Sequence, residues 1–415
     1  MNEMANPNDL ILALDTGTRT VTGVVLDDRG PVPRVLAAVT REHRSRSMLD
    51  GQIHDIEAVA EVVRQVKEEL EQRLGLEFTE AAVAAAGRAL LTRRGVASLE
   101  IAQLGEVEAA DVCQWELEAV QEAQAQLRAE IQREEEVYHC VGYAVVGYEL
   151  DGSRIKSLVG HRGRRAAVEV LATFLPEVVV DSLYTVLRRA GLTVASMTLE
   201  PIAASQVVIP VDLRQLNLAL VDVGAGTSDI AVARHGALIG FGMVPFAGDE
   251  ISERLAEAYL LDFATAEQVK KELAAATELD SLELDFADVL GNRHRCPAGQ
   301  ILAELEPVVA ELAERIARQI VALNEKPPSA VLLVGGGSLT PLLPAKLAER
   351  LSLPLNRVVV RGREELPMEL EGELEGLTGP EAVTPVGIAL SSRSQKGMAF
   401  RSWEVTVNER RVRLF

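Results

Sequence analysis

Two segments far apart in this chain repeat one order of residues: an apolar strand that ends in aspartate, a turn with glycine and threonine, and another apolar strand. The first unit spans 11–25 with Asp15-Thr16-Gly17-Thr18 at its turn, and the second spans 219–232 with Asp222-Val223-Gly224-Ala225-Gly226-Thr227. A strand, a tight turn and a strand form the antiparallel start of a sheet. The repeat therefore predicts two related lobes, each beginning with a hairpin that carries an aspartate to its turn.

The length and charge of the chain indicate how many lobes it has and which kind of partner it does not bind. With 415 residues it is longer than a single hydrophobic core usually supports, which agrees with two lobes. It has 42 basic and 62 acidic residues, a net charge of −20 with histidine neutral, and only 4% aromatic residues. Binding to nucleic acid depends on clustered lysine and arginine and on aromatic rings that stack on bases. The composition therefore excludes a general nucleic-acid binder.

The sequence also indicates a compartment. No uninterrupted run of 18 apolar residues occurs, and the first residues lack the basic segment and cleavage site of a secretory signal. The three cysteines, Cys113, Cys140 and Cys296, lie far apart, so neither a disulfide framework nor a thiolate metal site is expected. We expect a cytoplasmic protein.

The first lobe is interrupted by a segment of different character. After the first hairpin, apolar residues recur at helical spacing over 56–74, and a short strand is expected at 83–86. The strand pattern resumes at 168–174, and a helix is expected at 177–190.

Within the interruption, at 87–165, strand-like pieces at 95–101 and 139–146 bracket an acidic helical stretch at 106–136. This pattern predicts a small α/β subdomain inserted into the first lobe.

The second lobe continues with helices expected at 250–260, 265–275 and 300–324. A strand at 330–334 then runs directly into three glycines. The stretch 361–379, rich in glutamate and glycine, is expected to be a solvated loop.

The paired turns suggest a site for Mg²⁺ and phosphate. A carboxylate at the end of a strand can hold the water shell of Mg²⁺, and the backbone N–H groups of the following turn can bind phosphate oxygens. Either turn alone is better explained as an ordinary hairpin, because Asp, Gly and Thr are common turn residues. Two such turns facing each other across a cleft could hold a triphosphate from both sides.

A third element follows the strand at 330–334, where Gly335, Gly336 and Gly337 precede Ser338. Glycine lets a backbone approach a flat base or a ribose where a Cβ would clash. A plain strand-to-helix connection is the alternative for this element taken by itself.

These three elements, in this order, resemble the actin-like ATPase superfamily, which includes actin, the heat-shock chaperone ATPase domain, sugar kinases and the bacterial protein FtsA. The turns resemble its two phosphate motifs and the glycines its adenosine motif. Three further segments resemble its first connecting helix, its second connecting helix and the helix that reaches the nucleoside. They are Leu199-Glu200-Pro201-Ile202-Ala203-Ala204, Thr384-Pro385-Val386-Gly387-Ile388-Ala389 and Ala266-Glu267-Gln268-Val269-Lys270-Lys271. The resemblance runs from about residue 10 to residue 390.

The resemblance implies an α/β, two-lobed fold that is ribonuclease-H-like and duplicated, with ATP and Mg²⁺ bound between the lobes. The first-lobe core is expected at 9–86 and 166–212, the inserted subdomain at 87–165, the second lobe at 213–383 with a smaller subdomain at 247–300, a return helix at 384–400 and a strand-like tail at 401–415.

The resemblance also implies roles for particular residues. Asp15 and Asp222 would hold Mg²⁺ through water, and together with Glu200 they are the candidate catalytic residues. The residues expected to contact the nucleotide are Gly17, Thr18, Arg19, Gly224, Ala225, Gly226, Thr227, Gly248, Glu267, Lys270, Lys271, Gly335, Gly336, Gly337 and Ser338.

Within the superfamily the chain most resembles FtsA, with the pilus-assembly protein PilM next, because in both the extra subdomain interrupts the first lobe. FtsA implies a nucleotide-dependent adaptor in bacterial cell division that has FtsZ as its partner, self-associates into filaments, acts at the inner face of the membrane and is at most a weak Mg-dependent ATPase. PilM implies a cytoplasmic scaffold of type IV pilus assembly that binds a short peptide of a pilus protein. A metabolic kinase of the same fold is the third alternative. The chain has no GxxxxGK[ST] motif, which excludes a P-loop enzyme.

The sequence departs from the family pattern in three places. Arg19 stands where relatives often have a small hydroxyl residue, and Ala247 precedes Gly248 where a glycine pair is frequent. FtsA ends in an amphipathic membrane helix, whereas 403–414 alternates with the period of a strand. We expect a strand pair there, which would open a further domain of a longer protein, and membrane contact that is indirect or made by a segment outside this chain. A membrane-binding helix is the alternative.

Overall fold

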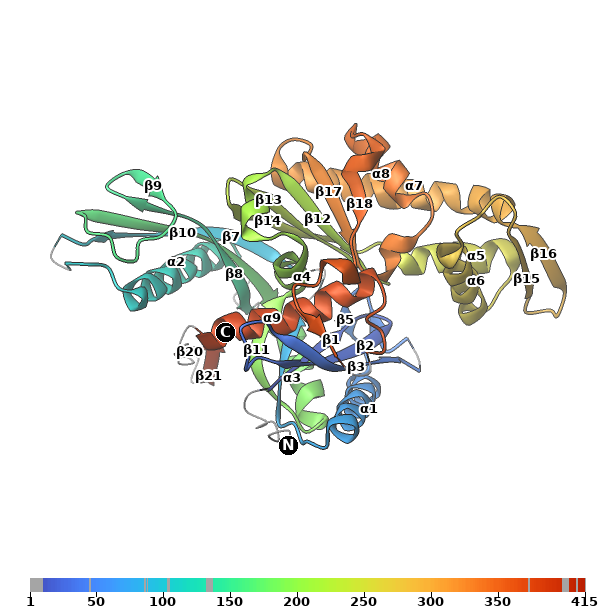
Figure 1. Cartoon of the computed structure of the whole chain (residues 1–415), viewed down its shortest axis with the longest axis horizontal. Helices are drawn as coiled ribbons and strands as arrows, with labels where there is room; N and C mark the ends of the chain where they lie inside the picture. The colour runs from blue at the N-terminus through green and yellow to red at the C-terminus, as the bar shows by residue number, and fades with distance from the viewer. Residues whose placement is uncertain are drawn as a thin grey trace.

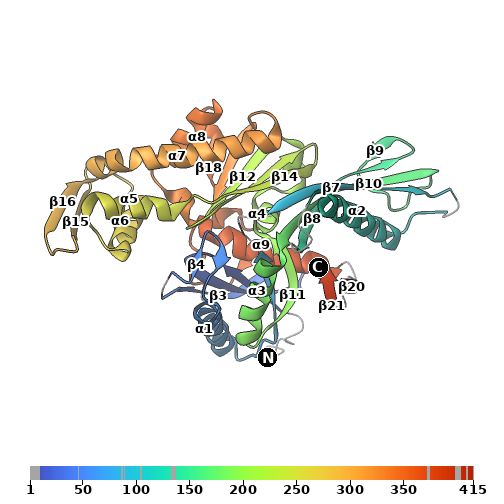
Figure 2. The same cartoon turned by 180° about the vertical axis from the view of Figure 1, so that it is seen from behind.

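The computed structural model describes residues 10–44, 46–85, 87, 89–102, 105–131, 137–371, 374–397, 403–407 and 410–414. The molecule is elongated (Figure 1), with two central sheets and a small subdomain at each end. The view from behind (Figure 2) shows the same arrangement, so the two end subdomains lie on opposite sides of the central lobes.

The first lobe is built on a six-stranded sheet in the order β11-β6-β1-β2-β3-β19. Helices α1 and α3 pack on one face and α4 and α9 on the other, which is why β1 is apolar along nearly its whole length. The strands are β1 (Leu10–Thr16), β2 (Thr20–Asp27), β3 (Arg34–Glu42), β6 (Glu80–Ala85), β11 (Thr193–Leu199) and β19 (Glu369–Leu370). The helices are α1 (Ile56–Leu74), α3 (Glu177–Arg189), α4 (Glu200–Val208) and α9 (Val383–Gly397).

Helix α1 has the bounds expected from its periodicity, and local signals explain both ends. The carboxylate of Asp55 accepts a hydrogen bond from the Ala58 N–H at 3.0 Å, which caps the first turn. Gly75 adopts the left-handed conformation with φ of 67°, which ends the helix.

The second lobe repeats the sheet of the first. Its strand order β18-β17-β12-β13-β14 matches β11-β6-β1-β2-β3, with the same parallel and antiparallel neighbours. The duplication inferred from the two hairpins is therefore confirmed at the level of whole sheets. The strands are β12 (Leu218–Val223), β13 (Ser228–Arg234), β14 (Ala237–Val244), β17 (Ala330–Val334) and β18 (Val358–Val360).

Helices α7 (Ala298–Asn324) and α8 (Leu343–Leu351) complete the second lobe. Its smaller subdomain is formed by α5 (Gly248–Tyr259), α6 (Phe263–Ala275), β15 (Glu283–Ala287) and β16 (Arg293–Pro297).

The inserted subdomain is a sheet in the order β7-β10-β8-β9, with α2 packed on it. Its elements are β7 (Leu91–Glu100), α2 (Ala109–Glu130), β8 (Tyr138–Leu150), β9 (Ser153–Ile155) and β10 (Arg165–Pro176). Helix α2 approaches β7 closely at Gly95, where an added Cβ would lie 1.8 Å from the carbonyl oxygen of Ala119. The expected end of α2 at 136 falls in residues outside the described part of the chain.

The expected boundary at 165 needs correction. Strand β10 pairs with β7 and β8 from Arg165 to Phe174 rather than with the first-lobe sheet. Its hydrogen-bond ladder therefore assigns it to the inserted subdomain, which extends to Pro176.

The expected solvated loop at 361–379 is also wrong. Part of it forms β19, which pairs in parallel with β3, and Leu377 is fully buried. Glu375 accepts hydrogen bonds from Arg41 at 2.6 Å and from Arg73 at 3.0 Å. The chain thus returns to the first lobe by Glu369, before the boundary expected at 384, because the acidic residues of this stretch pair with first-lobe arginines while its leucines face the core.

Short elements complete the description. The tail forms β20 (Trp403–Val407) and β21 (Arg410–Leu414), which pair antiparallel as the alternation predicts, and residues 408–409 between them lie outside the described part of the chain. None of the helices in the described ranges has the length and apolarity to cross a membrane.

The remaining elements are β4 (Met48–Leu49), β5 (Gln52–Ile53), η2 (Val211–Gln215), η3 (Gly336–Leu339), η4 (Leu355–Arg357), η5 (Arg363–Glu365) and η6 (Pro380–Ala382).

Candidate functional site

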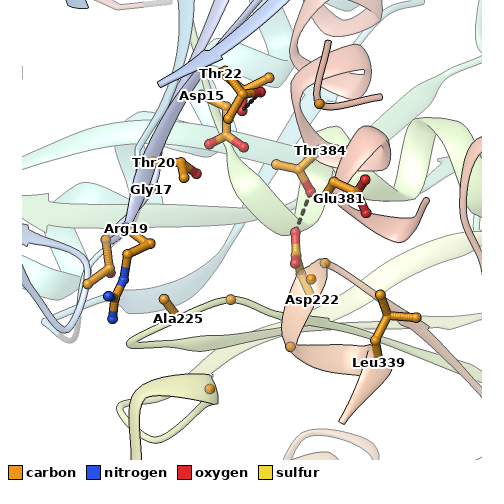
Figure 3. Close-up of a pocket in the computed structure, with 18 of the residues that line it drawn as sticks. Asp15, Gly17, Arg19, Thr20, Thr22, Asp222, Ala225, Leu339, Glu381 and Thr384 are labelled. Carbon is orange, nitrogen blue, oxygen red and sulfur yellow. Dashed lines mark hydrogen bonds between the residues drawn. The ribbon is translucent and has the colours of Figure 1, made fainter. Parts of the chain in front are cut away.

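A cavity of about 450 Å³ lies between the lobes, and it brings together residues expected to form a site (Figure 3). They come from both hairpin turns, the start of α4, the first turn of α5, helix α6 and the glycine segment after β17. These lining residues are Asp15, Gly17, Thr18, Arg19, Glu200, Asp222, Gly224, Ala225, Thr227, Gly248, Glu267, Lys270, Lys271, Gly335, Gly336 and Gly337.

The two hairpin turns have the same geometry. The Gly17 N–H donates to the carbonyl oxygen of Thr20 at 2.9 Å, and the Gly224 N–H donates to that of Thr227, also at 2.9 Å. Each turn follows a strand that ends near an aspartate lining the cavity. The cavity is therefore bounded by two equivalent turns, one from each lobe.

Four carboxyl groups lie close together: Asp15, Glu200 and Asp222 line the cavity, and Asp229 is buried beside Asp222. Burial and the negative charge of Asp222 raise the pKa of Asp15 to about 7. Burial, together with the other acidic groups, raises the pKa of Glu200 well above its ordinary value. Burial also raises the pKa of Asp222. A divalent cation nearby would relieve this accumulation of like charge.

The fourth carboxyl group, Asp229, was not among the residues expected from the sequence. It lies on β13 directly opposite Asp222 in the hairpin register, and burial followed by the Asp222 charge raises its pKa to about 7. The sequence does contain a signal for it: the register of the repeat places Asp229 where the first hairpin has Thr22, and Thr22 lines the cavity.

The glycine segment lies close to the second turn. An added Cβ on Gly337 would lie 2.6 Å from the carbonyl oxygen of Gly224, so only glycine allows this approach. Gly336 differs, because it lines the cavity and an added Cβ would meet no protein atom within 4 Å. A side chain there would project into open space, which is the arrangement expected where a flat ligand passes close to the backbone.

Helix α6 contributes two basic side chains to the site, Lys270 and Lys271. The ammonium group of Lys270 lies 2.7 Å from the Glu267 carboxylate and donates to the carbonyl oxygen of Gly248 at 2.8 Å. Burial lowers the pKa of Lys270. Ala274 and Ala275 also line the cavity, and the sequence analysis missed them although they follow Lys270 and Lys271 by one helical turn.

Two expected residues do not line the cavity. Ser338 is buried, and its hydroxyl donates to the carbonyl oxygen of Gly335 at 2.6 Å, so its side chain stabilises the turn instead. An added Cβ on Gly226 would lie 3.1 Å from Thr18 Oγ1, so Gly226 faces the first turn. Arg19 does line the cavity, but its guanidinium group is bonded to Asp249 of the second lobe.

Other lining residues were not expected. Some are adjacent to recognised motifs: Thr16 and Thr20 belong to the first turn, and Leu339 and Thr340 follow the glycines. Thr384 begins the segment that resembles the second connecting helix. The others come from β2, β3, the segment after β4 and the return segment, for which the sequence has no local signal: Thr22, Thr40, Glu42, Gly51, Gly376 and Glu381.

The residues fit a magnesium nucleotide whose metal is held through water. Within the described ranges, no three His, Cys, Asp or Glu side chains are placed to hold a metal ion directly. The hydroxyl oxygen of Thr16 is buried at the cavity without a hydrogen-bond partner among the described residues. A magnesium nucleotide could pair with this hydroxyl and pack against the open face at Gly336. Its cation would offset the negative charge of the clustered carboxylates.

The sequence of this chain is similar to that of a known family over several of the segments that form the cavity. Residues 219–387, which include the second turn, the glycine segment and Thr384, match the family model described as cell division protein FtsA. Cell division protein FtsA of Escherichia coli strain K12 is 26% identical over 329 residues, which cover 78% of this chain and 75% of that protein.

Two solved structures share the fold. The PilM-PilN type IV pilus biogenesis complex superposes with a TM-score of 0.65 at 18% identity, covering 92% of this chain and 98% of that one. MreB 5 of Spiroplasma citri bound to AMPPNP superposes with a TM-score of 0.53 at 14% identity, covering 94% and 97%. The chain has the actin-like ATPase fold, and its sequence resembles FtsA.

Proposed function

We propose that this chain is an ATP-binding adaptor of bacterial cell division, of the FtsA type, with an FtsZ-like protein as its partner. The observation that carries the proposal is the pair of equivalent turns, which present Asp15 and Asp222 to one cavity from two lobes. The match to the FtsA family model over 219–387 supports the division role.

In this proposal the backbone amides of the two turns bind the phosphates, and Glu267, Lys270 and Gly336 contact the nucleoside. Mg²⁺, when bound, would neutralise phosphate charge, and its water shell would be ordered by Asp15 and Asp222. The structure of MreB 5 with AMPPNP supports a nucleotide as the ligand of this fold.

Hydrolysis is proposed to be slow, so that the nucleotide acts mainly as a switch for assembly or partner binding. Phosphoryl transfer to water needs positioning and charge neutralisation more than covalent chemistry, and in this proposal Glu200 would order the water shell or the attacking water. The protein would act in the cytoplasm, at the inner face of the membrane through its partner.

The test is fluorescence anisotropy of a labelled C-terminal tail peptide of FtsZ, titrated with the protein in Mg-ATP. A scrambled peptide is the control, and ATP binding is measured in the same sample. Saturable micromolar binding of the FtsZ peptide alone supports the proposal. Absence of peptide binding while ATP binds argues against the division role and leaves the nucleotide site standing.

A PilM-like scaffold is the second candidate, because the PilM-PilN complex covers nearly the whole of both chains. A labelled PilN peptide, titrated in parallel, decides between the two candidates. Tighter binding of the PilN peptide than of the FtsZ peptide would assign the chain to pilus assembly.

A further inference from the structure

We propose that Thr384 is a positioning residue that couples the angle between the lobes to the orientation of the Asp222 carboxylate. This inference rests on the proposed function, because it concerns how the site would bind a magnesium nucleotide. It assigns a role to a residue that the motif roles carried over from the family leave without one.

The contact is direct and buried. The hydroxyl group of Thr384 donates a hydrogen bond to the Oδ2 atom of Asp222, and both side chains are buried, at 5% and 8% exposure. In Figure 3 a dashed line joins the Thr384 hydroxyl to the Asp222 carboxylate. A carboxylate removed from water needs such a donor, so the hydrogen bond stabilises the charged form of Asp222 against the cost of burial.

The two residues belong to different lobes. Asp222 lies near the end of β12, at the centre of the second-lobe sheet. Thr384 lies in the first turn of α9, which packs on β1, β2, β6 and β11 of the first lobe. The hydrogen bond therefore crosses the boundary between the lobes and depends on their relative position.

The other carboxylate oxygen is confined by the glycine segment. An added Cβ on Gly335 would lie 2.2 Å from Asp222 Oδ1, so the backbone packs directly against it. The Gly335 N–H in turn donates to the carbonyl oxygen of Pro380 at 3.0 Å. Both groups that fix Asp222 are thus attached to the short segment 380–384 that leads into α9.

The same helix takes part in the crossing that joins the lobes. Helices α4 and α9 touch at Gly387, where an added Cβ would lie 2.1 Å from the carbonyl oxygen of Ala203. The first residue of α4 is Glu200, which lines the cavity. A rotation of the lobes about this crossing would shift Thr384 relative to Asp222, because the distance between them is set by where α9 begins.

The experiment compares ATP affinity in Mg²⁺ and in EDTA for the full chain and for Thr384→Val and Thr384→Ser. Valine has the shape of threonine without the donor, and we expect Thr384→Val to reduce the gain in affinity from Mg²⁺ roughly tenfold, the usual effect of losing a hydrogen bond to a charged group. Thr384→Ser keeps the hydroxyl, and we expect it to restore most of that gain.

Thr173→Val is the matched control, because Thr173 is fully buried in β10 and its hydroxyl donates to the Gly142 carbonyl oxygen at 2.7 Å, in the inserted subdomain. We expect it to leave the Mg²⁺ dependence unchanged. The proposal is overturned if Thr384→Val leaves the Mg²⁺ dependence intact, lowers affinity equally with and without Mg²⁺, or behaves like Thr173→Val. Failure of the unaltered chain to bind ATP at all would instead overturn the proposed function.

Discussion

The guanidinium group of Arg19 lies 2.5 Å from the carboxylate of Asp249, across the cleft between the lobes. Arg19 belongs to the first turn and occupies the position that Gly226 holds in the second, whereas Asp249 lies in the first turn of α5. The guanidinium group also lies over the ring of Phe263, 4.4 Å from its centre. The residue that departs from the family pattern in the first turn therefore joins the two lobes.

Further contacts join the lobes beside this pair. The ammonium group of Lys271 lies 3.0 Å from the carboxylate of Glu42, and Arg46 pairs with Glu253 while lying over the Phe263 ring at 4.7 Å. Opening the cleft would separate these charged pairs. Together the pairs therefore stabilise the arrangement in which the two lobes are close.

We expect Arg19→Ala to speed the release of bound nucleotide roughly fivefold, because a partly buried ion pair and a cation–π contact together contribute about 1 kcal/mol. The measurement is stopped-flow displacement of a fluorescent ATP analogue by excess ATP. Arg295→Ala is the control, since it removes an exposed ion pair with Glu283 in the β15–β16 hairpin, far from the cleft. An unchanged release rate in Arg19→Ala would show that the pair does not hold the cleft closed.

We expect Asp222→Asn to abolish Mg²⁺-dependent ATP binding while the fold is retained, because the amide keeps the shape but cannot carry the charge that orders the metal's water shell. Isothermal titration calorimetry with ATP in Mg²⁺ measures the loss, and circular dichroism checks the fold. Asp285→Asn, at an exposed position of β15, is the control. Wild-type affinity in Asp222→Asn would remove the main support for the nucleotide site.

Two adjacent glycines, Gly336 and Gly337, allow ligand binding and packing to be tested separately. We expect Gly336→Ala to lower nucleotide affinity at least about tenfold without lowering the melting temperature, because its Cβ would enter the cavity and meet no protein atom. We expect Gly337→Ala to destabilise the fold by roughly 1–3 kcal/mol, because its Cβ would clash with the Gly224 carbonyl oxygen. Equal effects of the two substitutions on stability, with no effect on affinity, would contradict the assignment of Gly336.

A pH-dependent stability is expected from Glu116 in the inserted subdomain. Burial raises the pKa of this carboxyl group, even though the hydroxyls of Tyr148 and Tyr143 donate to it at 2.5 and 3.0 Å. The folded chain therefore holds this proton more tightly than the unfolded chain, so the contribution to stability is present below the unfolded pKa and is lost as pH rises through the folded pKa.

We expect Glu116→Gln, which is neutral at every pH, to raise the melting temperature relative to the unaltered chain at pH 8 but not at pH 4. Thermal unfolding followed by circular dichroism at both values measures the difference. Glu149→Gln, at an exposed position of β8 in the same subdomain, is the control. If Glu116→Gln changed the melting temperature equally at both pH values, ionisation of Glu116 would not contribute to the pH dependence of stability.

Much of the fold was predictable because the decisive signals are local. Apolar runs that end in Asp and a glycine turn specify both hairpins, and helical spacing closed by Gly75 specifies α1. The same local chemistry, repeated twice and followed by three glycines, was enough to predict the two turns and the glycine segment that line the cavity. Local patterns failed at 361–379, where glutamates suggested solvent although they pair with Arg41 and Arg73 of the first lobe.

The order of residues along the chain is enough to specify the duplicated hairpins, the aspartate at the turn of each and the glycines that allow close packing, because these features depend on backbone conformation and on neighbours a few residues away. That Thr384 holds Asp222 from the other lobe and that Arg19 reaches Asp249 follows only from the way the two lobes pack. These partners lie up to 230 residues apart in the chain, as in the Arg19–Asp249 pair, and their meeting depends on how two separately folded lobes pack about the crossing of α4 and α9.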